Sequence, residues 1–148
     1  MANSLGDEIC LYLQSASIGL NFNGSGTINL FSTLLPDEPD LAAAVIERGG
    51  LPPVMWLTGW PAVNESKLEQ PVFQVRIRSG MTGYNAGNLL AQGVFGALQG
   101  VTETVLNSGG ALFHLITAQQ SPVYMGRDER ERHQWSQNFF VMWENDQR

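Results

Sequence analysis

The residue types in this chain that best suit catalytic or metal-binding chemistry are two histidines, one cysteine and scattered carboxylates. The histidines, His114 and His133, do not have the spacing of metal ligands, and Cys10 has no second cysteine to join it. His114 lies beside Phe113 and Leu115 with few titratable residues near it in the sequence, which favours a structural histidine. Cys10 falls within a predicted amphipathic helix, so we expect it to be a small buried residue and not a nucleophile.

A second candidate site is the charged run from Arg127 to Arg132, which His133 follows. Asp128, Glu129 and Glu131 alternate there with arginines, a pattern typical of a solvated hairpin tip. The glycine–serine–glycine stretch at 24–26 precedes a predicted strand and not a helix, so it is no phosphate-binding loop. We therefore expect no enzyme, no metal and no cofactor, although distant residues can still assemble a small hydrolytic or ligand-binding site.

The composition favours a subunit that contacts other proteins over a nucleic-acid binder. Of the 148 residues, 43% are hydrophobic and 15% charged, the net charge is −6, and Lys67 is the only lysine. Soluble domains average about 25% charged residues, so this surface suits either a subunit interface or a small neutral monomer. A DNA-binding protein needs a basic footprint, which is missing, but an acidic or neutral lumen would let DNA slide through.

Neither a membrane anchor nor export is expected. No apolar stretch approaches the ~20 residues of a membrane span. The amino terminus lacks the basic region of a signal peptide.

Helical periodicity predicts two helices. The first spans residues 4–16 with Ser4 as its cap, and the second spans about 84–99. Three glycines in the second helix each cost ~1 kcal/mol relative to alanine, so we expect at least one to be sterically required by a close neighbour. These glycines are Gly87, Gly93 and Gly96. The expected apolar stripes are Leu5, Ile9, Tyr12 and Leu13 in the first helix, and Ala86, Leu89, Leu90, Val94, Ala97 and Leu98 in the second.

Alternating and apolar stretches predict strands at 28–34, 72–79, 111–118, about 121–125 and 133–144. The stretch 41–47 fits either a short helix or a strand. Residues 50–71 look like a long loop rich in proline that carries Trp56 and Trp60, and long loops are usually functional or disordered. The whole reads as one α+β domain over 1–148, with two helices packed on a mainly antiparallel sheet and a long inserted loop.

Strand 72–79 carries two of the few cations of this acidic chain on one face. Phe73, Val75 and Ile77 make the apolar face, and Gln74, Arg76 and Arg78 make the other. Because the arginine fork suits buried carboxylates, we expect Arg76 and Arg78 to form ion pairs across a subunit boundary. The alternative is a solvated sheet face, where such pairs are worth only ~0–1 kcal/mol.

The second half of the chain resembles phage tail terminators and related minor capsid proteins in the order of its motifs. Pro122-Val-Tyr-Met-Gly-Arg-Asp-Glu129 resembles the family's P-x-x-L-G-R-D-E stretch. The other matching stretches are 71–78, the helix from Tyr84-Asn85-Ala86 to Leu98-Gln99-Gly100, and Gln137-Asn138-Phe139-Phe140-Val141. In the first half, Gly49-Gly50 with Pro52-Pro53 resembles the family's glycine-rich exit from an early strand, which favours a strand at 41–47. Residues 56–69 match no part of the family pattern.

The resemblance implies a small α+β subunit of a six-fold ring on the tail tube, within the virion after assembly in the host cytoplasm. Its role would be to stop tube growth and to join the tail to the head. The implied partners are other copies, the tail tube protein and a neck or head-completion protein, with DNA only passing through the lumen. A neck protein on the portal side is the alternative. Candidate contact residues are Trp56, Trp60, Arg76, Arg78, Arg127 and Asp128.

Overall fold

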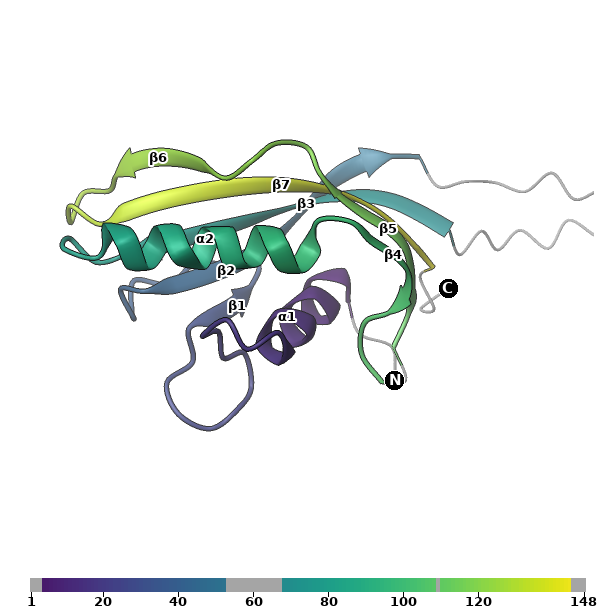
Figure 1. Ribbon diagram of the computed structural model, residues 1–148, viewed down its shortest axis with the longest axis horizontal. Helices are drawn as coiled ribbons and strands as arrows, with labels where there is room; N and C mark the ends of the chain where they lie inside the picture. The colour runs from purple at the N-terminus through teal and green to yellow at the C-terminus, as the bar shows by residue number, and fades with distance from the viewer. Residues whose placement is uncertain (1–3, 53–67, 109, 145–148) are drawn as a thin grey trace, which may run out of the picture.

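A seven-stranded sheet with two helices on one face organises the chain (Figure 1). The computed structural model describes residues 4–52, 68–108 and 110–144. The helices are α1 (Leu5–Ser15) and α2 (Tyr84–Leu98). The strands are β1 (Leu30–Ser32), β2 (Ala42–Leu51), β3 (Leu68–Ser79), β4 (Val101–Val105), β5 (Leu112–Ala118), β6 (Val123–Arg127) and β7 (His133–Glu144).

The strand order is β1-β2-β3-β7-β5-β4, and β6 also pairs with β7. Among the strands that the structure describes, only β1 and β2 run parallel, and every other pair is antiparallel. This confirms the predicted α+β fold with a mainly antiparallel sheet. No helix among the described residues is long and apolar enough to cross a membrane.

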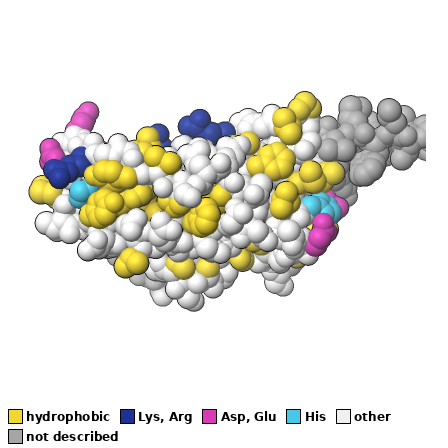
Figure 2. Space-filling model, turned by 45° about the horizontal axis from the view of Figure 1, so that its top comes forward, with side chains coloured by type: hydrophobic (Ala, Val, Ile, Leu, Met, Phe, Trp, Pro, Cys, Tyr) yellow, Lys and Arg dark blue, Asp and Glu magenta, His cyan; other side chains and the backbone are white. Residues whose placement is uncertain are grey.

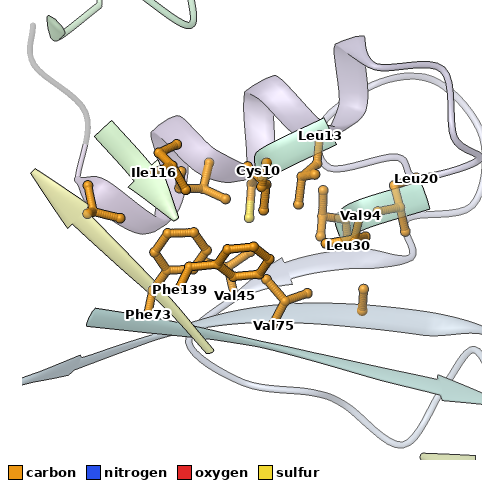
Figure 3. Packing of buried hydrophobic residues seen from close by; sticks show 14 of the residues in the cluster. Cys10, Leu13, Leu20, Leu30, Val45, Phe73, Val75, Val94, Ile116 and Phe139 are labelled. Atoms are coloured by element: carbon orange, nitrogen blue, oxygen red, sulfur yellow. The ribbon is translucent and has the colours of Figure 1, made fainter. Parts of the chain in front are cut away.

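Strict alternation along β3 and β7 gives the sheet two different faces. On β3, Phe73, Val75 and Ile77 are fully buried toward the helices. Phe73 stacks on Phe139 of β7 at a ring-centroid distance of 5.2 Å. Figure 3 shows these rings and Val75 packed with side chains from β1, β2, β5 and both helices. The opposite face of the sheet, which neither helix covers, is called the outer face below; Gln74 and Arg76 lie on it.

Helix α1 forms as its sequence predicts. The hydroxyl of Ser4 accepts a hydrogen bond from the backbone N–H of Asp7, which satisfies one of the free donors of the first turn. Cys10 is completely buried, as expected, between α1 and the sheet (Figure 3). Its thiol therefore serves as a small apolar group.

The buried stripe of α2 differs from the predicted one. Leu89 is 71% exposed and Ala86 is also exposed, so both were wrongly assigned to the core. Gly87 takes the place on the buried side that Ala86 was expected to take. The side chain of Trp135 fills the space beside Gly87. A stripe read from hydrophobicity alone cannot identify a buried glycine, because the apolar group there belongs to another element.

Some predicted strand boundaries differ from the observed ones, because pairing with a neighbouring strand determines where a strand begins and ends. The predicted strand at 28–34 shrinks to β1, and the following residue, Thr33, has a left-handed φ of 83°. β4 was missed because its residues are mostly polar, yet it pairs with β5. The stretch 41–47 is strand, as the family resemblance favoured.

The ends of the predicted loop 50–71 are strand. β2 continues to Leu51 and β3 begins at Leu68. A bulge between Arg48 and Leu51 accommodates the glycine pair there. A Cβ atom on Gly50 would lie 2.2 Å from the carbonyl oxygen of Gln70, so only glycine fits at this close approach. Residues 53–67, including Trp56 and Trp60, lie outside the described residues.

Candidate interaction surfaces

The charged turn between β6 and β7 is anchored to the loop before β2. The guanidinium of Arg132 donates to Asp128 Oδ2 at 2.7 Å, and to Asp37 Oδ1 and the Asp37 carbonyl at 3.0 and 2.7 Å. Only 8% of the Arg132 side chain is exposed. The expected solvated hairpin tip is therefore wrong for Arg132, because its partner Asp37 lies 95 positions earlier in the sequence.

These contacts favour the ionised form of both carboxylates. The hydrogen bond from Arg132 holds the pKa of Asp37 below its ordinary value. For Asp128, burial acts to raise the pKa, but hydrogen bonds from Arg132 and from the backbone of Arg130 outweigh it and lower the pKa. Asp128 and Arg127, both predicted to contact another subunit, therefore differ in their exposure to solvent. Asp128 turns inward to Arg132, whereas Arg127 is exposed and pairs with Glu131 at 3.1 Å.

Arg76 and Arg78, the two arginines predicted to lie at a subunit boundary, have different surroundings in the structure. Arg78 is buried and donates to the backbone carbonyls of Pro39 and Asp40 at 2.5 and 3.1 Å, so it holds the 36–40 loop within its own chain. Arg76 is partly exposed on the outer face, and its Nε donates to Oε1 of Gln74 at 3.1 Å. Arg48 on β2 donates to the same oxygen at 3.3 Å. The sequence analysis did not single out Arg48, because the pairing of β2 with β3 brings it there.

An aromatic cluster lies where β6 and β7 meet the start of α2. It consists of Tyr84, Tyr124, His133 and Trp135, whose rings contact one another at centroid distances of 5.3–6.2 Å. The Nε2–H of His133 donates to the Met81 carbonyl at 3.0 Å, and in the neutral ring the Nδ1 accepts from the Tyr124 hydroxyl at 2.8 Å. The two tyrosines and Met81 are exposed. Figure 2 shows hydrophobic side chains gathered beside one of the histidines on this face.

His114 on β5 is held between carboxylates of the two neighbouring strands. Its Nδ1 lies 3.0 Å from both oxygens of Glu103 on β4, and its Nε2 lies 3.1 Å from Oε1 of Glu144 on β7. These hydrogen bonds, first with Glu103 and then with Glu144, raise the pKa of His114 above its ordinary value. With acceptors at both ring nitrogens, a protonated ring links the edge strand β4 to β7, which agrees with a structural histidine.

The described residues hold no group of three histidine, cysteine, aspartate or glutamate side chains that could bind a metal ion. The His114 cluster illustrates why. Its two ring nitrogens point to different carboxylates, so one ion could not be bound by all three side chains. What the geometry offers is contact surface: an exposed aromatic cluster, a charged turn and an outer sheet face.

Residues 12–142 match the family model described as "Bacteriophage tail terminator protein". The chain belongs to the bacteriophage tail terminator family. It is therefore a structural protein of the phage tail, located in the virion, as its motif order implied. Among proteins with curated functional descriptions, none matches the sequence of this chain.

A solved structure has a fold similar to that of this chain. It is a chain of the "Virion of native gene transfer agent (GTA) particle", with a TM-score of 0.59 over 96% of each chain. Sequence identity is 12%, so this likeness concerns the fold alone.

Proposed function

We propose that the chain is one subunit of a ring, six-fold as in the family it resembles, at the head-proximal end of the tail tube. The ring ends growth of the tube and then joins the tail to the head. The match to the tail terminator family over residues 12–142 carries this proposal. DNA passes through the lumen without being held, which suits a chain of net charge −6.

The sheet supports a ring because its two lateral edges differ. On one side, β1 covers only Ala43–Val45 of β2, and the rest of β2 continues past it. On the other side lie β6 and β4, and neither has a second strand partner among the described residues. Contacts between two unlike edges are head-to-tail, and head-to-tail contacts close into rings where the rotation permits. Edge pairing between copies is thus compatible with the proposed assembly.

The proposed contacts between subunits are those candidate side chains that are exposed at the surface. Arg76 and Arg127 present charge at the surface, and Tyr84 and Tyr124 present aromatic groups of a kind enriched at interfaces. Trp56 and Trp60 lie outside the described residues and are proposed contacts from residue type alone. Arg78 and Asp128 act within the chain in this proposal, because their side chains are bonded to its own groups.

Tail length in particles made without this protein tests the proposal. Electron microscopy should show tubes of irregular and excessive length that are not joined to heads, and expression of the wild-type chain should restore both. Tubes of normal length that fail to join heads would instead assign the chain to the neck on the portal side. Normal particles in its absence would contradict both roles.

A further inference from the structure

Two arginines on the outer face of the sheet share one neutral acceptor. Arg48 and Arg76 both donate to Oε1 of Gln74, at 3.3 and 3.1 Å. Among the described residues neither arginine has an ion pair. Arg127, Arg130 and Arg132 contrast with them, since each has at least one carboxylate partner.

The register of the sheet explains why no carboxylate reaches this pair. Arg76 lies between Ala44 of β2 and Ser136 of β7, and Gln74 lies between Ile46 and Asn138. Every one of these neighbours is neutral. Two cations therefore lie close together among uncharged side chains and share one amide oxygen, with Arg76 partly exposed and Arg48 exposed to solvent. Figure 2 shows one group of basic side chains at the upper edge of the molecule, apart from acidic side chains, and another beside the acidic side chains at the left end.

The surroundings favour a dry contact. Next to the pair along the outer face are Val72 and Phe140, which are paired across β3 and β7 and are half-buried. Gln74 itself is only 6% exposed, so its amide holds the two guanidinium groups in place. Guanidinium groups fixed in this way match the two oxygens of a carboxylate, and a bond of that kind is stronger where water is excluded.

We propose that Arg48, Gln74 and Arg76 form a receptor for a carboxylate side chain of a second copy of this chain. The inference deepens the proposed ring, on which it rests, by naming where one subunit receives the next. Charge complementarity identifies the occupant: the chain has 14 acidic residues against 8 basic ones, so a neighbouring copy presents carboxylates. DNA is the less suitable occupant, because duplex binding proteins neutralise about 6–10 phosphates and this face offers two cations.

Sedimentation of the purified full-length chain over a range of concentrations and at low and high salt tests the receptor. The R48Q/R76Q variant should self-associate roughly 30-fold more weakly than wild type, as expected for loss of a charge pair at an interface. Wild-type association should weaken in high salt. R130Q is the control, because it also removes a positive charge, one already paired with Asp37 within the chain. It should associate as wild type does.

Thermal unfolding separates this role from a structural one. The R48Q/R76Q monomer should have an unchanged or slightly higher Tm, because the variant removes repulsion between two cations. Equal association of R48Q/R76Q and wild type would overturn the inference, as would a wild-type chain that stays monomeric in both salts. Loss of duplex DNA binding in R48Q/R76Q, with self-association intact, would assign the pair to phosphate and overturn it too. Each of these results leaves the proposed function, tested by tail length, standing.

Discussion

Gly87 of α2 lies directly against the indole ring of Trp135 on β7. A Cβ atom at position 87 would be 2.3 Å from Cζ3 of that ring and 2.6 Å from Oγ of Ser79. Trp135 is 2% exposed, so neighbouring groups enclose the ring. The absent side chain at this one position sets how closely α2 approaches the sheet, which agrees with the expectation that at least one glycine of the helix is sterically required.

Replacing Gly87 by alanine should therefore destabilise the fold by about 1–3 kcal/mol, because overpacking of a filled core outweighs the better helix propensity of alanine. Gly96→Ala is the matched control, since a Cβ there meets nothing within 4 Å. That change should stabilise by up to about 1 kcal/mol. Urea unfolding of both variants measures the difference, and equal stability of the two would contradict the role of the contact.

His114 should make stability depend on pH. Its folded-state pKa lies above the ordinary value of 6.5, because Glu103 and Glu144 accept from both ring nitrogens. A raised pKa contributes stability that is fully present below the unfolded pKa of 6.5 and is lost as the pH rises through the folded pKa. The free energy of unfolding should fall across that window in wild type.

Urea unfolding at a series of pH values above 5 checks this contribution. In His114→Gln the fall should disappear, and in Glu103→Gln it should be smaller, because one of the two acceptors no longer carries charge. A wild-type curve that runs parallel to that of His114→Gln through the window would show that the ring gains no proton affinity on folding.

Loss of Arg132 should release the loop before β2 from the turn between β6 and β7. Arg132→Gln should cost about 2 kcal/mol, in the range for hydrogen bonds to charged groups, because the partner side chain of Asp37 is itself largely exposed. Arg127→Gln breaks an exposed pair with Glu131 and should cost less than about 1 kcal/mol. Thermal denaturation ranks the two, and a larger effect at position 127 would be inconsistent with the buried network.

Cys10 should be inert in the folded protein. Burial, with the nearby charge of Asp7, raises the pKa of its thiol to about 12, so almost no thiolate forms near neutral pH. Labelling with a thiol reagent at pH 7.5 should be negligible in buffer and rapid in denaturing urea. Fast labelling of the folded chain would show that α1 does not cover the thiol as the structure has it.

Local patterns in the sequence were enough to predict several elements of the fold and the family. The alternation of Trp135, Phe139, Val141 and Trp143 predicted the bounds and the buried face of β7, because period-two burial is a property of a single strand. The cap of α1 at Ser4 could be predicted because it depends on a hydrogen bond that spans only three residues. The order of short motifs placed the chain among tail terminators, since those motifs keep their sequence order whatever the packing.

Tertiary structure alone decided which charges far apart in the sequence meet. Arg132 reaches Asp37, and His114 reaches Glu103 and Glu144, across separations that no local pattern encodes. Strand register is likewise a property of two segments at once, so only the pairing of β2 with β3 brought Arg48 beside Gln74. The requirement for glycine at position 87 of α2 also comes from another element, because the Trp135 ring on β7 leaves no room for a larger side chain there. Close packing depends on the shape of both partners.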